Sequence, residues 1–160
     1  MVDINKTLTI KLIFIISILA LASAFFIEHA LGHQPCNLCI LERIPYLMAI
    51  VIIILNYKFV HLEKYFILFL IIIFLVATIL SLYHLGIEQG FIKESLVCDL
   101  KNGSNLLTKE DILEQLKQKN VSCQDVTFKM FGLSLTSYNV LISLIITIST
   151  AKVYFNYDKS

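Results

Sequence analysis

Four apolar segments dominate the chain and are separated by shorter polar ones. Lys, Arg, Asp and Glu are absent from 16 consecutive residues at 12–27, 14 at 44–57, 23 at 65–87 and 22 at 130–151. A helix needs about 20 apolar residues to cross a bilayer, so the last two segments are long enough by themselves. The second reaches that length only if its helix begins further back, near Leu38.

This pattern predicts an all-α membrane protein, with a single domain over residues 1–160 folded as a four-transmembrane-helix bundle. We expect spans near 9–30, 40–58, 65–87 and 130–152, and outer loops near 31–39 and 88–129. A second helix that begins near Leu38 carries Glu42 and Arg43 into the membrane interface. Charged residues at such positions are functional candidates.

The first apolar segment has a second interpretation as a secretory signal peptide. Lys6 and Lys11 precede the apolar run, and the "ASA" at residues 22–24 is similar to a cleavage site. The apolar run continues past this site to Ile27, which favours a helix that is retained.

The composition supports a membrane protein and excludes some other classes. Of the 160 residues, 58% are hydrophobic and 16% are charged, and the mean hydropathy is +0.80. A soluble domain of this length rarely carries so much apolar surface. The net charge of +1 gives no electrostatic basis for binding nucleic acid.

The distribution of basic residues predicts the orientation in the membrane. With four spans, both termini and the loop at 58–64 lie on one side. That side has six lysines in short segments close to helix ends: Lys6, Lys11, Lys58, Lys64, Lys152 and Lys159. The other side has seven basic residues, mostly in the long loop together with acidic ones. The positive-inside rule therefore favours cytoplasmic termini, with the other two loops on the outer side of the membrane.

All four cysteines fall in the two outer loops: Cys36 and Cys39 in the first, Cys98 and Cys123 in the second. Disulfides persist on the outer side of a bacterial membrane, which agrees with the orientation predicted from charge. Between the two cysteines of the long loop, Thr108 is a suitable N-cap for a short amphipathic helix.

The first cysteine pair lies in the stretch "QPCNLCILERIPY" at 34–46. A C-x-x-C pair can cycle between dithiol and disulfide, and a helix N-terminus or a nearby cation increases its reactivity by lowering a thiol pKa. If a helix begins near Asn37, then Cys36, Cys39 and Arg43 share one face. We expect Arg43 to stabilise the Cys39 thiolate, or negative charge on an electron acceptor beside it. At this depth a lipid-soluble quinone is the acceptor that the pair can meet.

Several other roles compete with this one. A zinc site would need a second close pair, whereas Cys98 and Cys123 are 25 positions apart, so we expect no metal. Haem attachment needs a histidine directly after the second cysteine, and residue 40 is Ile. A non-catalytic scaffold with two structural disulfides stays open, as does a role for Arg43 as a simple interface anchor.

Three stretches resemble the family of disulfide bond formation protein B. The stretch "EHALGHQPCNLCILERIPY" looks like the first outer loop of that family. "SLYHLGIEQG" is similar to the end of its third helix, and "SCQDVTFKMFGLSLTSYN" to the start of its fourth. The order of a close pair and then a wide pair also matches. One departure is that many members have Trp where Phe128 stands, and this chain has no Trp.

The resemblance implies a membrane protein-dithiol:quinone oxidoreductase that generates disulfides. It also implies a multi-pass protein of the bacterial inner membrane whose cysteine loops are periplasmic. In such a relay, Cys98 and Cys123 form the disulfide that oxidises a DsbA-like periplasmic thioredoxin-fold partner. Cys123 then passes the electrons to the disulfide of Cys36 and Cys39, and Cys39 passes them to ubiquinone or menaquinone bound near Arg43. In bacteria, a chain of this kind from soluble partner to membrane protein to quinone keeps the periplasm oxidising.

The histidines are further candidate site residues. His84, at the outer end of the third span, can line a quinone site or relay protons, or it can be a hydrogen-bonded interface histidine. Glu88, four residues further on, is a possible partner for it. His29 and His33 have a spacing that suits a metal, but we expect them to face the loop. The main rival enzyme is a vitamin K epoxide reductase-like protein, in which the C-x-x-C follows the loop pair instead of preceding it.

Overall fold

The structure is a computed structural model that describes residues 2–93, 123, 129–130 and 132–157. Its four long helices are α1 (Val2–His29), α3 (Arg43–Lys58), α4 (Glu63–Glu88) and α6 (Leu135–Tyr157). The shorter elements are α2 (Asn37–Leu41), the 3-10 helix η1 (Val60–Leu62), and the strands β1 (Lys129–Met130) and β2 (Leu133–Ser134).

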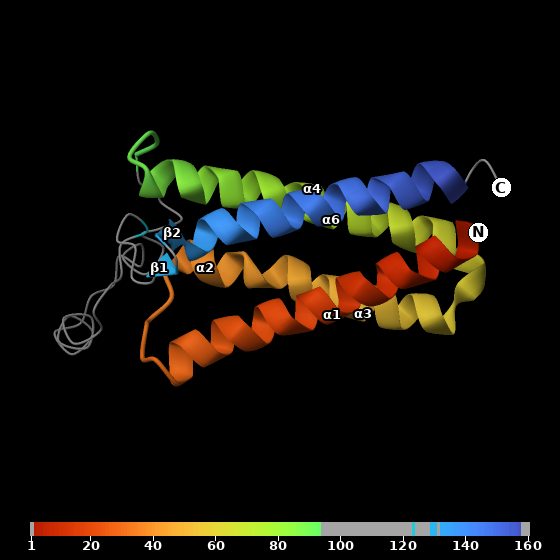
Figure 1. Cartoon of the computed structure of the whole chain (residues 1–160), viewed down its shortest axis with the longest axis horizontal. Coiled ribbons are helices and arrows are strands. Elements are labelled where there is room, and N and C mark those ends of the chain that lie inside the picture. The colour runs from red at the N-terminus through yellow and green to blue at the C-terminus, as the bar shows by residue number, and fades with distance from the viewer. Residues whose placement is uncertain (1, 94–122, 124–128, 131, 158–160) are drawn as a thin grey trace, which may run out of the picture.

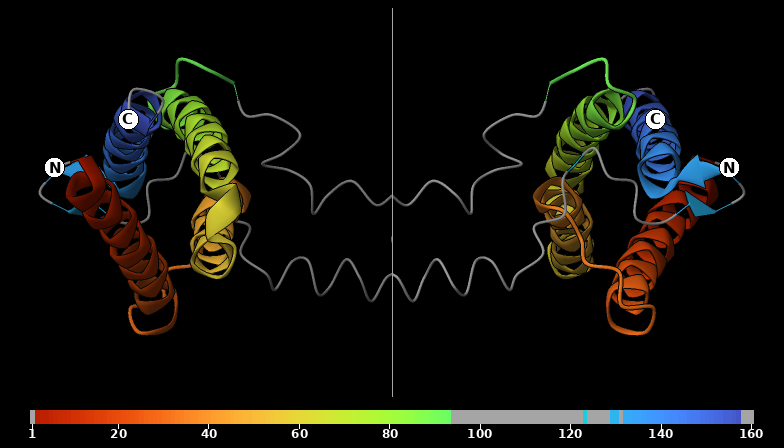
Figure 2. Two further views of the ribbon diagram at one scale, coloured as in Figure 1. Left: turned by 90° about the vertical axis from the view of Figure 1, so that its right-hand side faces the viewer. Right: turned by 90° about the vertical axis from the view of Figure 1, so that its left-hand side faces the viewer.

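The four long helices form a ring in which each packs against two others. Helix α1 contacts α3 and α6, and α4 contacts the same two helices (Figure 2). The beginning of α1 and the end of α6 lie at the end of the bundle that holds η1, whereas α2, β1 and β2 lie at the opposite end (Figure 1). The predicted four-helix bundle is therefore confirmed.

All four long segments can cross a membrane by length and composition. These segments are Lys6–His29, Asn37–Lys58, Val60–Glu88 and Leu135–Asn156. The last begins at Leu135 instead of the predicted 130, because β1 and β2 pair antiparallel directly before it. Gly132, with φ of 83°, has the left-handed conformation that favours glycine in the tight turn between them. The amphipathic helix predicted in the long loop lies outside the described residues.

Apolar side chains cover the outside of the bundle as well as its inside. The interior cluster consists of Ile10, Ile13, Leu21, Tyr46, Ala49, Ile53, Leu70, Phe74, Ala77 and Ile146. On the outer surface Leu19, Phe69 and Ile145 are each more than half exposed. Such a surface is stable against lipid tails but not against water. This two-sided apolar character is why the sequence predicts the spans well but not which face of each helix points inward.

The second span contains a break that orients two charged residues. Helix α2 ends at Leu41 and α3 begins at Arg43, with Glu42 as the turn between them. Pro45 lacks the N–H that would bond to the carbonyl of Leu41, and its ring crowds that carbonyl, so the helix cannot continue regularly. In the first turn of α3 the missing N–H costs little. Glu42 lies inside the bundle and is only 8% exposed.

Candidate functional site

The C-x-x-C pair lies at the N-terminus of α2. Cys36 is the N-cap, in an extended conformation, and its Sγ accepts a hydrogen bond of 3.2 Å from the backbone N–H of Cys39. The two Sγ atoms are 2.6 Å apart and are not joined by a disulfide bond in the structure. A disulfide bond is about 2.05 Å long, so only a small movement separates this dithiol from its oxidised form. Cys36 is buried, whereas Cys39 is partly exposed.

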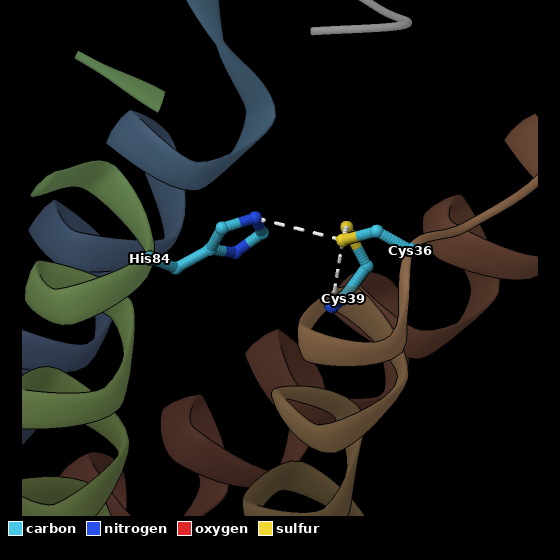
Figure 3. Close-up of side chains that lie close together, drawn as sticks. All are labelled: Cys36, Cys39 and His84. Atoms are coloured by element: carbon cyan, nitrogen blue, oxygen red, sulfur yellow. Dashed lines mark hydrogen bonds between the residues drawn. The ribbon is translucent and has the colours of Figure 1, made fainter. Parts of the chain in front are cut away.

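His84 extends from α4 toward this pair and is its main polar neighbour (Figure 3). Its Nε2 lies 3.5 Å from Cys36 Sγ, and its Nδ1 lies 2.9 Å from Glu42 Oε1. An ionised carboxylate only accepts hydrogen bonds, so Nδ1 carries a proton. Nε2 and Cys36 Sγ then share the remaining proton, either as thiol and neutral ring or as thiolate and charged ring. The ring is 1% exposed, so water does not compete for these contacts.

A second layer of hydrogen bonds holds Glu42 in place. Its Oε2 accepts a bond of 2.7 Å from Asn139 Nδ2, and the same amide nitrogen donates to Ser81 Oγ over 2.8 Å. The hydroxyl of Tyr46 donates to Asn139 Oδ1. Both carboxylate oxygens of Glu42 are thus partnered, which offsets the high cost of burying its charge. The network joins the second span to α4 and α6 beneath the thiol pair.

The electrostatic surroundings favour a thiolate at Cys36. The hydrogen bond from the Cys39 thiol is the largest influence and lowers the pKa of Cys36, burial opposes it, and His84 lowers the pKa further, to about 5 in total. The lowered pKa makes Cys36 the more readily ionised thiol of the pair. We expected the stabilising charge to act on Cys39, whereas these contacts act on its neighbour.

Arg43 contacts α1 rather than the sulfur atoms. Its Nη1 lies 2.5 Å from Glu28 Oε2, and its guanidinium carbon lies 5.2 Å from the centroid of the Phe25 ring. Arg43 thus lies where α1 meets α3, one residue away from the buried Glu42. Beside it, Ile40 and Ile44 are each 46% exposed on the outer surface.

The structure also brings Cys123 to the first cysteine pair. Cys123 is disulfide-bonded and 2% exposed, and it belongs to one buried cluster with Cys36, Leu38 and Ile87. Cys98 lies outside the described residues, so its pairing with Cys123 stays a prediction. The tertiary structure therefore gathers three of the four candidate cysteines at one end of the bundle.

The structure also shows the partners of other polar candidates. Glu88 was a possible partner of His84, but it accepts a hydrogen bond of 2.7 Å from Thr136 Oγ1, so that pairing was wrong. His29 Nδ1 lies 3.1 Å from the carbonyl of Phe25 in its own helix. Tyr46, Ser81 and Asn139 lie within the three stretches that resemble the family, but the sequence alone assigned none of them a role. Polar residues inside apolar spans are the signal that could have found them.

A helical membrane bundle with a C-x-x-C pair at one end is typical of the class of membrane thiol oxidoreductases. Over residues 6–153 the chain matches the family described as "Disulfide bond formation protein DsbB". The chain belongs to this family and is an oxidoreductase of disulfide-bond formation, with several spans in the inner membrane.

One relative is similar to this chain over nearly its full length. "Uncharacterized protein RP370" of Rickettsia prowazekii (strain Madrid E) is 33% identical over 162 residues, which cover 99% of this chain and 92% of that protein. No solved structure matches the chain.

Proposed function

We propose that this chain reoxidises a DsbA-like periplasmic thioredoxin-fold protein and passes the electrons through two cysteine pairs to a membrane quinone. The observation that carries this proposal is the Cys36–Cys39 dithiol, with its thiolate held by His84 and with Cys123 in the same buried cluster. Membership of a family that works with quinones and with such partners supports it. An inert scaffold would need neither a lowered thiol pKa nor a buried histidine beside the sulfur.

The thiol steps balance as two successive exchanges. A thiolate of the partner attacks Cys98 Sγ of the Cys98–Cys123 disulfide, a mixed disulfide forms, and Cys123 leaves as a thiolate. The second thiol of the partner then resolves the mixed disulfide, so the partner is oxidised and the Cys98–Cys123 pair is reduced by two electrons. This pair reduces the disulfide of Cys36 and Cys39 in the same way and returns to its oxidised form.

The buried cluster supports a direct exchange between Cys36 and Cys123. Thiol–disulfide exchange requires contact between the sulfur atoms, and both side chains are more than 90% buried in one cluster with Leu38 and Ile87. The Cys123 thiolate attacks Cys36 Sγ, the bond between Cys36 and Cys39 breaks, and Cys39 leaves as a thiolate. When Cys98 then attacks Cys123 in the mixed disulfide, Cys36 leaves as a thiolate that His84 can stabilise over 3.5 Å. Glu42 holds the ring in the tautomer that this contact needs.

The residues beside Cys39 fit a quinone head group. Ile40 and Ile44 offer an apolar surface toward the lipid, and Arg43 offers a cation that is already stacked on Phe25. A bound quinone would supply the acceptor for two electrons and two protons. His84 lies between a thiol and a carboxylate, so it can hold and release a proton at Nε2 while Glu42 keeps its position.

The proposed function also requires a particular orientation of the bundle in the membrane. The cysteine end of the bundle is opposite the end where α1 begins and α6 ends (Figure 1). With the lysine-rich short segments in the cytoplasm, the thiols face the periplasm, where a DsbA-like partner and an oxidising environment are available. A membrane-impermeant thiol reagent applied to intact, reduced cells should therefore label the cysteines from outside.

The decisive experiment is quinone reduction by the purified full chain in detergent when a reduced DsbA-like protein is supplied. We expect one quinone reduced for each partner disulfide formed, measured by the loss of quinone absorbance and by thiol titration. The control is the same reaction with oxidised partner, which should reduce no quinone. Partner that stays reduced in the presence of active chain and quinone would contradict the proposal.

A further inference from the structure

We propose, against the expectation of no metal from the cysteine spacing alone, that the reduced Cys36–Cys39 pair and His84 form a binding site for a soft divalent metal ion of the Zn²⁺ class. Binding of this ion competes with oxidation of the pair. Among the residues that the structure describes, these three side chains are the one group of at least three such ligands whose donor atoms lie within 4.8 Å of one another (Figure 3). The binding itself is independent of the proposed function, and only its regulatory consequence rests on that function.

The distances between the donor atoms are close to those of a tetrahedral site. With Zn–S bonds of about 2.3 Å and Zn–N bonds of about 2.0–2.1 Å, tetrahedral angles require about 3.5 Å between sulfur and nitrogen and about 3.8 Å between two sulfurs. Cys36 Sγ and His84 Nε2 are 3.5 Å apart, which already fits. Cys36 Sγ and Cys39 Sγ are 2.6 Å apart and must separate. Cys39 is partly exposed, so its side chain has room to rotate outward.

Glu42 gives the site the outer contact that metal-bound histidines usually have. Such a histidine donates its other ring N–H to a carboxylate or a carbonyl, which fixes the ring and makes it a better ligand. Nδ1 of His84 lies 2.9 Å from Glu42 Oε1, and Asn139 holds the other carboxylate oxygen over 2.7 Å. Nε2 is thereby aimed at the sulfurs by a network that exists before any ion binds.

Metal binding and disulfide formation exclude each other at this pair. Coordination needs both sulfurs as thiolates, so the thiols release their protons and no electron moves. In the oxidised pair each sulfur is already bonded to the other, and this ligand set is lost. An ion on the pair would hold it in the reduced state until the ion dissociates, and electron transfer to the quinone would stop.

The test is a metal titration of the reduced, detergent-solubilised full chain with Co²⁺ in the absence of air, followed by displacement with Zn²⁺. We expect one Co²⁺ per chain, with the visible d–d bands of tetrahedral cobalt and a near-ultraviolet thiolate-to-cobalt band. Oxidation of the chain should abolish both signals. A reduced chain that binds no Co²⁺ would overturn the proposal.

Variants assign the signal to these ligands. His84→Gln and Cys39→Ser should each weaken the apparent affinity at least about tenfold, and Glu42→Gln should weaken it about 10–100-fold through loss of the outer contact. His61→Gln, an exposed histidine at the other end of the bundle, and Cys98→Ser are the matched controls and should bind as the parent does. If Cys98→Ser removes the signal, the ion binds elsewhere and the proposal is wrong.

Two readouts keep this proposal separate from the proposed function. The thiolate-to-cobalt band of the parent chain reports two sulfur ligands and should fall by about half in Cys39→Ser, so the assignment does not depend on His84→Gln folding well. A chain that reduces quinone but binds no Co²⁺ overturns the metal site alone. With a metal site in place, Zn²⁺ should inhibit quinone reduction and a chelator should restore it, and unchanged turnover at saturating Zn²⁺ overturns the competition.

Discussion

Two sets of buried polar side chains in the same bundle satisfy their hydrogen bonds in opposite ways. Along α4 and α6, hydroxyls donate to carbonyls of their own helix, as Thr78 does to Phe74 over 2.8 Å and Thr150 to Ile146 over 2.6 Å. At the cysteine end, His84, Glu42 and Asn139 bond to one another across different elements. The first set needs no partner from another helix, whereas each member of the second set depends on the others.

The first set serves the packing of the helices, whereas the second set positions the groups next to the thiol pair. Small hydroxyl residues let membrane helices approach closely, and their hydrogen bonds contribute little net stability because the backbone carbonyl is already bonded. A buried carboxylate and imidazole are costly, and they persist only in a network that satisfies them. We therefore expect substitutions in the second set to change the reaction, and substitutions in the first to change almost nothing.

The largest effect should follow from Cys39→Ser. Without this sulfur the first pair cannot form its disulfide, so quinone reduction with a reduced DsbA-like partner should fall to background. Combined with Cys98→Ser, it should leave Cys36 and Cys123 joined under mild oxidation. After cleavage at a protease site engineered near His61, a non-reducing gel should show the two halves held together. Halves that separate without reductant would mean that the relay order is wrong.

His84→Gln should have the next largest effect. It removes the group that shares a proton with Cys36, and loss of such proton transfer typically slows turnover by about 10²-fold. Thr150→Val is the matched control, since it removes an equally buried polar group that bonds only within its helix. Steady-state quinone reduction measures both. Equal rates in the two variants would contradict the distinction between the two sets.

Arg43→Gln should weaken the apparent affinity for quinone by about tenfold, the loss of one charge-assisted contact. The disulfide that contains Cys123 should still form, because Arg43 contacts Glu28 and Phe25 instead of any cysteine. Arg43→Lys should restore only part of the affinity, since lysine lacks the planar fork. If Arg43→Gln reduces quinone with the parent's affinity and rate, the arginine only anchors the helix.

The titration of Cys36 should reveal the influence of His84 directly. Because the pKa of Cys36 is lowered to about 5, the thiolate should be present above that pH and lost as the pH falls through it. In reduced Cys98→Ser/Cys123→Ser chain, thiolate absorbance should show this midpoint. His84→Gln should move the midpoint up toward the ordinary thiol value, about 8.5. A midpoint that does not move would show that His84 does not lower the pKa of Cys36.

The smallest effect should come from the hydroxyls of the packing set. Thr78→Val should change the free energy of unfolding by about 0.6 kcal/mol or less, because its bond to Phe74 lies within one helix and its contact with Thr147 Oγ1 of α6 is long, at 3.5 Å. Asn139→Leu is the contrasting variant, because it strands an oxygen of buried Glu42, at a cost of about 1–3 kcal/mol. Unfolding of both variants in a denaturing detergent series would give the two values.

The sequence by itself determined the membrane architecture and the position of the thiol pair. Bilayer thickness sets the length of an apolar run, so the spans follow from where Lys, Arg, Asp and Glu interrupt it. The helix start near Asn37 and the close approach of Cys36 and Cys39 are local features that neighbouring residues encode. The later start of the fourth helix was missed because the turn at Gly132 and the pairing of β1 with β2 leave only a short, apolar signal.

The partners of the buried charges were decided only by the tertiary structure. A spacing of four residues suggested Glu88 for His84, but such spacing describes only neighbours on one helix. His84 instead bonds to Glu42 of the neighbouring span, and Arg43 bonds to Glu28 of α1. Because every face of these helices is apolar, no periodic pattern states which residues face the interior. The packing of the four helices determines which residues face the interior, and therefore which charged residues lie near the thiol pair.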